Sequence, residues 1–194
     1  MEDPGNFGES GESREIAAMR ALAGGDDSAL NRLMDDWSPR VTAMIYRMTG
    51  NASVASDLAQ ETFVRLYLTR ARYRPGNSAR PFSTWLFGIA ANLVRNHLRW
   101  RGRHPESPLD DADEQTAPGD PARSADARER GEAIRKAIAT LPPDQREVLV
   151  LAEYEGLSHA EIASVVRCSV KAVERRLSHA REILRRELAR FLQG

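Results

Sequence analysis

The chain has 194 residues, and its 28 lysines and arginines are balanced by 28 aspartates and glutamates, so the formal net charge is zero. This length accommodates one or two small domains. The sequence lacks both a membrane-length apolar run and the pattern of a secretory signal, so we expect a cytoplasmic protein with no membrane span. A single cysteine, Cys168, excludes an internal disulfide framework, and the four histidines lack metal-ligand spacing. We therefore expect no metal site and no cofactor.

The first half of the chain is predicted to be helical. Residues 1–13 are rich in Gly, Ser, Glu and Asp, and we expect a flexible tail there. Over residues 14–101 apolar side chains recur at helical spacing. Gly24-Gly25 and Gly50-Asn51 are expected to end helices, and Ser38-Pro39 is expected to start one.

The second half begins with a change of composition. Residues 102–127 combine four prolines and two glycines with a run of acids, which is typical of a flexible linker. Helical periodicity returns over residues 128–194. Because no segment alternates like a strand, the predicted fold is all-α, with two small helical domains joined by a flexible acidic linker.

Charge is sorted along the chain. Between Thr62 and Pro105 there is no acidic residue, yet nine arginines are interleaved with aromatic residues such as Phe82 and Trp85. Guanidinium groups neutralise phosphates and aromatic rings stack on unpaired bases, so this pattern indicates a surface that binds single-stranded nucleic acid. The alternative interpretation is a basic helical surface over an aromatic core. A further hypothesis is that the acidic linker folds against this basic surface in the free protein.

The end of the chain has the pattern of a helix-turn-helix. Leu141-Pro142-Pro143 separates two helices, and Ser158 with Glu161 forms a capping box at the start of a short helix. A tight turn follows at residues 167–169, and Ser169 caps a long final helix. This final helix is expected to bury Val170, Val173, Leu177, Ala180, Leu184 and Leu188 and to keep a basic outer face. The alternative is an ordinary helical hairpin with a charged face.

With both ends considered, the chain resembles the extracytoplasmic-function group of bacterial sigma factors, the promoter-specificity subunits of RNA polymerase. The resemblance covers about residues 26–190. Its most specific stretches are Asp57-Leu58-Ala59-Gln60-Glu61-Thr62-Phe63, the run from Phe82 to Asn92, Leu141-Pro142-Pro143 with Arg146, and Glu155-Gly156-Leu157-Ser158 with Glu161-Ile162-Ala163. The resemblance implies a domain two at residues 14–101, which docks on polymerase and melts DNA, and a domain four at residues 128–194.

The resemblance also implies contacts with the polymerase. The helix that carries the first motif would dock on the clamp helices of the largest subunit through Asp57, Gln60, Glu61 and Arg65. Independently of the resemblance, the four-residue spacing of positions 57, 61 and 65 places them on one face of a helix. Domain four would contact the flap of the second-largest subunit, and an anti-sigma factor is an implied partner.

The minus-ten promoter element would lie on the next helix and on the loop before it. On one face of that helix, polar residues and a glycine recur at steps of three and four residues. A glycine on this face would let a DNA backbone approach closely. The family flips a non-template base into a pocket here, which costs a few kcal/mol. The predicted residues are Tyr73, Arg74, Asn77, Arg80, Thr84, Trp85, Gly88, Asn92, Arg95 and Arg99.

The minus-thirty-five element would be read in the major groove by the final helix. Family members usually carry Gly-Thr-Val and a basic residue near its start, whereas this chain has Lys171-Ala172-Val173-Glu174. Glu174 suits a cytosine amino group and Arg175 or Arg176 a guanine, and which of them touches a base is left open. The predicted residues are Ser169, Lys171, Glu174, Arg175, Arg176, His179 and Arg181.

A stand-alone transcriptional regulator is the alternative function, because similar motifs open the helix-turn-helix of response-regulator output domains. That class requires a sensing or dimerising domain, and the first hundred residues show no such pattern. A nucleic-acid-modifying enzyme requires a nucleophile with a base, a metal cluster or a phosphate loop. The sequence shows none of these, so we expect no catalysis by this chain.

Overall fold

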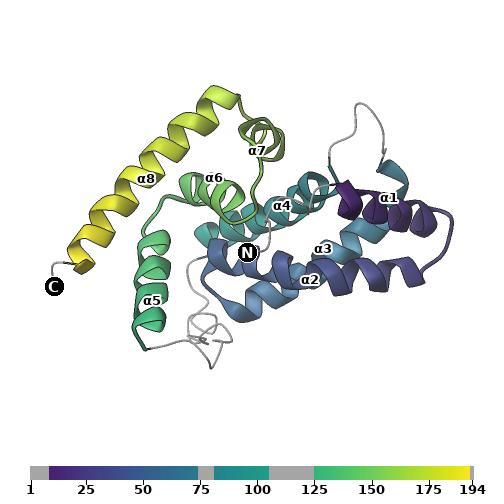
Figure 1. Cartoon of the computed structure of the whole chain (residues 1–194), viewed down its shortest axis with the longest axis horizontal. Coiled ribbons are helices and arrows are strands. Elements are labelled where there is room, and N and C mark those ends of the chain that lie inside the picture. The colour runs from purple at the N-terminus through teal and green to yellow at the C-terminus, as the bar shows by residue number, and fades with distance from the viewer. Residues whose placement is uncertain (1–8, 74–80, 105–124, 193–194) are drawn as a thin grey trace, which may run out of the picture.

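The structure, a computed structural model, describes residues 9–73, 81–104 and 125–192. These residues form eight α-helices and a short 3-10 helix, η1, with no strand among them, which confirms the all-α prediction. The elements are α1 (Glu9–Ala23), α2 (Ser28–Thr49), α3 (Ala52–Thr69), η1 (Arg70–Arg72), α4 (Phe82–Arg103), α5 (Ala125–Ala139), α6 (Pro143–Glu153), α7 (His159–Val166) and α8 (Val170–Leu192). Figure 1 shows α1 to α3 at one end and α5 and α8 at the other, with α7 against α4 between them.

The first unit comprises α1 to α4, and α2 is its centre, because α2 packs on α1, α3 and α4. The indole of Trp37 meets the rings of Phe82 and Phe87 edge-on, with centroids 5.4 and 5.7 Å apart, an arrangement that aromatic pairs favour. Helix α2 ends at Gly50, whose φ of 72° lies in the left-handed region that favours glycine. The side chain of Asn51 then accepts a hydrogen bond from the Val54 amide at 2.9 Å and caps α3.

The prediction that Ser38-Pro39 starts a helix is wrong. Helix α2 runs unbroken from Ser28 to Thr49 with Pro39 inside it. A proline in a helix interior removes one backbone hydrogen bond and costs about 3 kcal/mol. The buried stripe nevertheless continues across it from Trp37 to Val41. Since each such side chain contributes about 1.5 to 3 kcal/mol on burial, the packing of one continuous helix outweighs the cost of the proline.

Two predicted boundaries also shift. Helix α1 begins at Glu9, so residues 9–13 are helical and not part of a tail. The reason is that extending an existing helix gains a backbone hydrogen bond for each residue fixed. Helix α4 ends at Arg103 and α5 begins at Ala125, so both ends of the predicted linker are helical as well. Residues 1–8 and 105–124 lie outside the described residues, and their flexibility stays a prediction.

The second unit comprises α5 to α8 and contains the predicted helix-turn-helix. The capping box is present, because the Ser158 hydroxyl accepts from the Glu161 amide at 3.3 Å and the Glu161 carboxylate accepts from the Ser158 amide at 2.8 Å. The Ser169 hydroxyl accepts from the Ala172 amide at 3.2 Å at the start of α8. Val173, Leu177 and Ala180 are buried as predicted, and Leu184 and Leu188 are half-buried. Val170 is 42% exposed, contrary to the prediction, because it is the first residue of α8, at the edge of the contact with α7.

Arg146 of α6 connects the ends of three segments. Its guanidinium donates to the carbonyl of Met48 at 2.9 Å, to that of Leu141 at 3.1 Å and to that of Ala139. Met48 lies in the last turn of α2 and Ala139 ends α5, where helix carbonyls lack partners and a positive charge is favourable. Burial lowers the pKa of this guanidinium, which nevertheless stays charged at neutral pH. Arg146 therefore joins the two units of the chain.

We expect Arg146→Ala to destabilise the protein by about 2 to 3 kcal/mol, because up to three carbonyls lose a charged donor. For a chain of this size the midpoint of thermal unfolding should fall by about 5 to 10 °C. Circular dichroism during heating measures it. Arg130→Ala, at an exposed position of α5, is the matched control and should leave the midpoint within about 2 °C. Equal midpoints for both variants would contradict this role.

Candidate binding surfaces

Helix α3 exposes the residues that were predicted to contact polymerase. Asp57, Gln60 and Arg65 are exposed and Glu61 is half-buried. The carboxylate of Glu61 lies 2.6 Å from Nε of Arg65, one helical turn away, as is typical of an i, i+4 ion pair. The opposite face of α3 is buried against the other helices of the first unit. The structure thus brings all four residues together on one accessible surface.

Two apolar residues of this surface were missed by the sequence reasoning. Val64 is 51% exposed and Leu68 is 66% exposed. They follow Glu61 at steps of three and four residues, so they extend the same helical face. That spacing could have identified them, because the buried face of α3 was already defined by its other apolar positions. Exposed apolar side chains beside charged ones are typical of a protein-binding surface.

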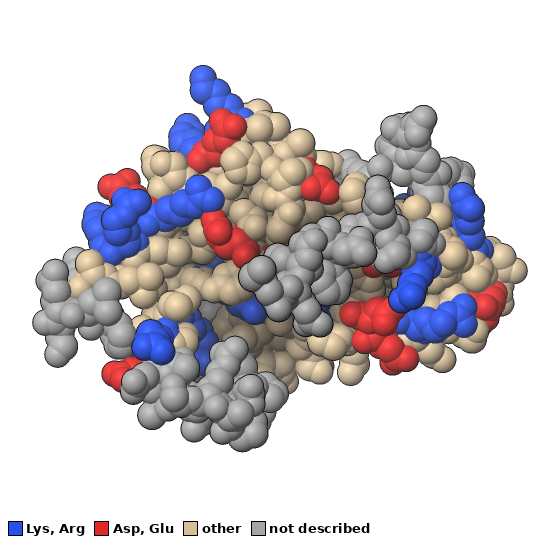
Figure 2. Space-filling model, in the orientation of Figure 1, with Lys and Arg blue, Asp and Glu red and all other residues tan. Residues whose placement is uncertain are grey.

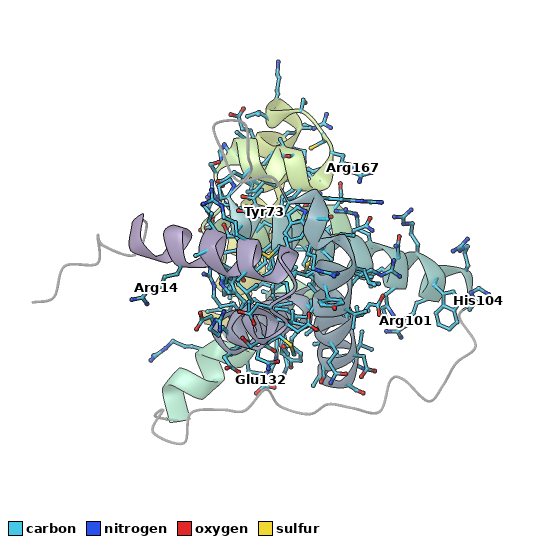
Figure 3. The ribbon with its side chains drawn as sticks, turned by 90° about the vertical axis from the view of Figure 1, so that its right-hand side faces the viewer. Arg14, Tyr73, Arg101, His104, Glu132 and Arg167 are labelled. Carbon is cyan, nitrogen blue, oxygen red and sulfur yellow. The ribbon has the colours of Figure 1, made fainter. Side chains whose placement is uncertain are left out.

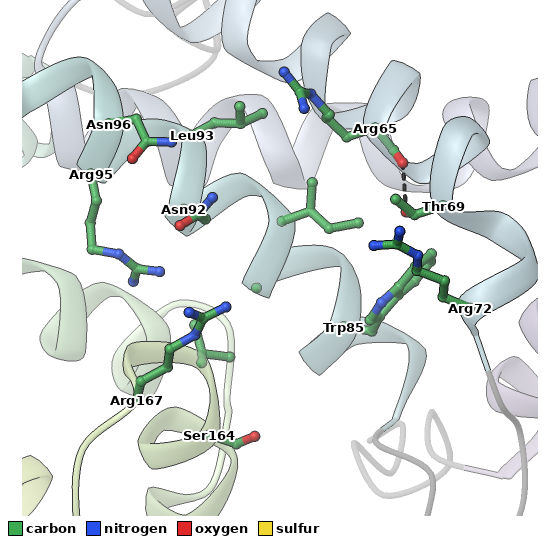
Figure 4. A pocket seen from close by; sticks show the side chains of 13 residues that line it. Arg65, Thr69, Arg72, Trp85, Asn92, Leu93, Arg95, Asn96, Ser164 and Arg167 are labelled. Carbon is green, nitrogen blue, oxygen red and sulfur yellow. Dashed lines mark hydrogen bonds between the residues drawn. The ribbon is translucent and has the colours of Figure 1, made fainter. Parts of the chain in front are cut away.

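The outer face of α4 borders a cavity of about 400 Å³, drawn in Figure 4. Trp85, Gly88, Asn92 and Arg95, all predicted minus-ten residues, line it. The other lining residues are Arg65, Thr69, Arg72, Ile89, Leu93, Asn96, Ser164, Val165 and Arg167. None of these described residues is acidic, and Figure 4 shows the guanidinium groups of Arg95 and Arg167 facing the same space. Guanidinium groups, an indole and amides suit a nucleotide.

Tyr73 does not lie where the sequence placed it. Its side chain is only 8% exposed and its ring packs on Phe82 and Trp85, with centroids 6.1 and 5.1 Å apart. In Figure 3 Tyr73 lies near the middle of the view, whereas Arg101 and His104 lie toward one side. Tyr73 is therefore a core residue in this conformation and not a stacking platform, because packing against aromatic neighbours removes its ring from water. Arg74, Asn77 and Arg80 lie outside the described residues.

The remaining minus-ten residues divide into accessible and covered ones. Asn92 and Arg99 are exposed, and Arg99 donates from Nε to the Arg95 carbonyl at 3.2 Å. Thr84 is only 1% exposed, and its hydroxyl donates to the carboxylate of Glu161 at 2.8 Å. Arg95 is half-buried and forms an ion pair with Glu147. Covered residues are thus held by side chains of the second unit.

Helix α8 carries the predicted minus-thirty-five residues apart from Ser169, which directly precedes it. In Figure 2 lysine and arginine side chains gather along the part of this face that α8 occupies. Ser169, Lys171, Glu174, Arg175, His179 and Arg181 are exposed. Nε of Arg176 lies 3.1 Å from a carboxylate oxygen of Asp144, and Arg181 lies 2.6 Å from Glu153, so both have intramolecular partners. Lys171 and Arg175 form no ion pair or hydrogen bond with the described residues.

Two carboxylates at the boundary between the units are buried. Burial raises the pKa of Glu147, although Arg95 beside it acts in the opposite direction. Burial also raises the pKa of Glu155, whose carboxylate lies 3.3 Å from the guanidinium of Arg40. In Glu161 burial is opposed by hydrogen bonds from Ser158 and Thr84, which hold its pKa below the usual value. At Glu147 and Glu155 burial therefore outweighs the neighbouring arginines in setting the direction of the pKa.

The sequence matches two family models, one in each unit. Residues 33–104 match sigma-70 region 2 and residues 131–184 match sigma-70, region 4. The RNA polymerase sigma-H factor of Pseudomonas aeruginosa is 35% identical over 178 residues, which span 87% of this chain and 91% of that protein. The ECF RNA polymerase sigma-E factor of Salmonella typhimurium is 32% identical over 169 residues, 82% of this chain and 86% of that protein. The structure of CnrH in complex with the cytosolic domain of CnrY has a TM-score of 0.66 and 28% identity, and covers 91% of this chain and 97% of CnrH.

Together the two helical units and these matches define an RNA polymerase sigma factor, a non-catalytic subunit of transcription initiation. Within that class the chain belongs to the extracytoplasmic-function (ECF) sigma factors. The stand-alone regulator gains no support, because the first unit matches region 2 over most of its length.

Among the described residues, no helix is both long and apolar enough to span a bilayer.

Proposed function

We propose that this sigma factor docks on core RNA polymerase through α3, holds the minus-ten element on α4 and reads the minus-thirty-five element with α8. The polymerisation chemistry belongs to the core enzyme, and the complex works in the cytoplasm. The observation that carries the proposal is the pairing on one molecule of an exposed charged and apolar stripe on α3 with the arginine-lined cavity on α4. A protein-binding surface beside a nucleotide-binding one is what a promoter-opening subunit requires.

The α3 stripe supports docking on a helical partner. Asp57, Gln60 and Glu61 supply charge and hydrogen bonds, while Val64 and Leu68 supply apolar area that docking removes from water. We assign this stripe to the clamp helices of the largest subunit. The flap of the second-largest subunit is the partner that we assign to the second unit.

The α4 cavity supports a role in strand opening. Asn92 is exposed beside it and can hydrogen-bond the Watson-Crick edge of an unpaired base, while the indole of Trp85 offers a stacking surface. Arg72 lines the cavity and Arg99 is exposed one turn after Arg95 on α4, so both are candidates for the flanking phosphates. A base captured here favours the melted state, because only an unpaired base can enter.

The outer face of α8 supports recognition of a duplex. Lys171 and Arg175 have no partner among the described residues and are therefore available to DNA, whereas Arg176 and Arg181 must first leave Asp144 and Glu153. Arg175 is the residue that we assign to a guanine, and Glu174 is the candidate for a cytosine amino group.

We also propose an anti-sigma factor as the regulatory partner. CnrH, whose fold and sequence are similar, was solved with the cytosolic domain of CnrY. A partner of that kind would have to cover a functional surface, and the exposed α3 stripe is one that such a partner could bind.

The test is run-off transcription with purified core polymerase and a genomic promoter library, with and without this chain. We expect chain-dependent transcripts that start downstream of a shared two-block motif. Binding of duplex DNA by the chain alone, without any chain-dependent transcript, would instead support the stand-alone regulator.

We expect Arg175→Ala to lower the affinity of the holoenzyme for promoters with an intact minus-thirty-five element by about tenfold, since a good base contact contributes about 1 to 3 kcal/mol. Competition gel shifts with intact and scrambled upstream elements measure it. A loss confined to the intact element indicates a base contact, and an equal loss on both indicates a phosphate contact. Arg130→Ala, exposed on α5, is the control and should bind like the wild type.

A further inference from the structure

The cavity beside α4 has walls from both units of the chain. The first unit supplies Arg72 from η1 and Trp85 and Asn92 from α4. The second unit supplies Ser164 from α7 and Arg167 from the turn that follows α7. The volume of about 400 Å³ lies within the usual range of small-molecule sites, roughly 300 to 1,000 Å³. The cavity is therefore of a size to hold a small molecule that is not part of a DNA strand.

Arg167 occupies a backbone position that favours glycine. It ends α7 with φ of 58° and ψ of 51°, and among the described residues it is the only one besides glycines with a positive φ. The left-handed conformation is unfavourable for a residue with a Cβ, and helices commonly end there in glycine. Figure 4 shows the guanidinium of Arg167 directed into the same space as that of Arg95. An unfavourable backbone position that carries a cavity-lining side chain indicates a function for that side chain.

Positive charge in this cavity is only partly compensated. Arg65 and Arg95 are paired with carboxylates. Arg72 and Arg167 are exposed and form no ion pair or hydrogen bond with the described residues. Figure 4 shows these two side chains on opposite sides of the cavity. Guanidinium groups across a space with no acidic lining residue among those described create a positive potential, and their planar forks suit phosphate oxygens.

The rest of the lining suits a nucleoside. The indole of Trp85 and the apolar side chains of Ile89 and Leu93 can pack against an aromatic ring. Asn92 and Asn96 are exposed, and their amides both donate and accept hydrogen bonds, as the edge of a base requires. Inorganic phosphate would leave all of these groups unused. The lining therefore favours an aromatic base joined to phosphates.

We propose that this cavity binds a free nucleoside polyphosphate. The base packs on Trp85, and Arg72 and Arg167 hold the phosphates from two sides, with the Ser164 hydroxyl as a further donor. Because Arg167 and Ser164 belong to the second unit, the ligand contacts both units at once. Binding requires only this chain, so the proposal does not rest on the assignment of α4 to the minus-ten element.

The consequence is a link between nucleotide concentration and the sigma factor. Trp85 and Asn92, which we assign to an extruded promoter base, also line the site of the free nucleotide. The two ligands therefore compete for one cavity. The fraction of free sigma factor with an empty cavity falls as the nucleotide concentration rises above the dissociation constant.

The first experiment is isothermal titration calorimetry of the full chain with ATP and with GTP, without divalent cations. We expect saturable binding of at least one of the two. Adenosine or guanosine and tripolyphosphate should each bind at least tenfold more weakly, because each offers only half of the contacts. The inference is wrong if neither nucleotide binds below about 1 mM. It is also wrong if tripolyphosphate binds as tightly as the nucleotides, which would indicate a simple anion site. Binding of an oligodeoxyadenylate without binding of ATP or GTP would mean that the cavity accepts nucleotides only within a strand, and would likewise overturn it.

The second experiment uses Arg167→Gly. This variant loses the guanidinium but has the residue that the backbone favours, so its midpoint of thermal unfolding should be no more than about 2 °C below that of the wild type. We expect its affinity for the nucleotide to fall at least tenfold, whereas Arg130→Ala, exposed on α5, should bind like the wild type. Unchanged affinity of a folded Arg167→Gly variant would contradict the proposal.

Arg72→Ala tests the opposite wall of the cavity. Arg72 is exposed on η1, so its truncation should not unfold the protein, and the nucleotide affinity should again fall at least tenfold. This variant decides the question in the same way if Arg167→Gly is unstable. Run-off transcription tests the sigma function separately. A chain that supports transcription but binds neither nucleotide would refute this inference alone.

Discussion

Leu68→Glu is expected to weaken the complex with core RNA polymerase by about tenfold to a hundredfold, because truncated or disrupted interface anchors cost about 1 to 3 kcal/mol or more. Leu68 is 66% exposed on α3, so the free chain gains little from its apolar side chain. In the complex the same side chain would lie against the partner, where a carboxylate must lose its water without gaining a counter-charge. Surface plasmon resonance on immobilised core polymerase measures the change in affinity.

The matched control is Ile134→Glu, which introduces the same charge at a large apolar residue of α5 that is 40% exposed. It should bind core polymerase within about twofold of the wild type. Both variants should unfold thermally within about 2 °C of it, since neither position is buried. Equal losses of binding in the two variants would mean that added negative charge, and not the α3 stripe, controls docking.

Local rules were sufficient for most helix boundaries. The Ser158–Glu161 capping box and the Gly50 helix end depend on neighbours within a few residues, and both are present where the sequence places them. The charged and amide residues of the α3 stripe also follow from helical spacing, because one helix positions them all, whereas Val64 and Leu68 were missed although the same spacing could have identified them. These features could be predicted since the interactions that decide them are close in sequence.

Features that depend on distant partners could not be predicted in this way. Pro39 stays inside α2 because residues of α3 and α4 bury the helix on both sides of it. Tyr73 is buried because Phe82 and Trp85, on the other side of residues 74–80, pack around its ring. The pairing of Thr84 with Glu161 joins residues 77 positions apart and follows no periodicity. Tertiary packing decides each of these cases.

Asn92→Ala is expected to impair promoter opening by about tenfold or more while leaving the closed complex nearly unchanged. An extruded base loses stacking and pairing worth a few kcal/mol, and contacts in the pocket must offset that loss. Asn92 is exposed beside the Trp85-lined cavity, and its amide both donates and accepts hydrogen bonds. Alanine removes these hydrogen bonds at the step where the base leaves the duplex.

Permanganate reactivity of unpaired thymines measures opening, and gel shifts at low temperature measure the closed complex. Asn31→Ala, the same change at an exposed position of α2, should alter neither. Measuring both complexes also distinguishes the role of Asn92 from that of the neighbouring arginines. Loss of Arg99 should weaken both complexes and make them more sensitive to salt, since phosphate contacts exist before and after melting. If Asn92→Ala reduces the two complexes equally, its amide acts on the duplex, and the base-capturing role of the α4 cavity is wrong.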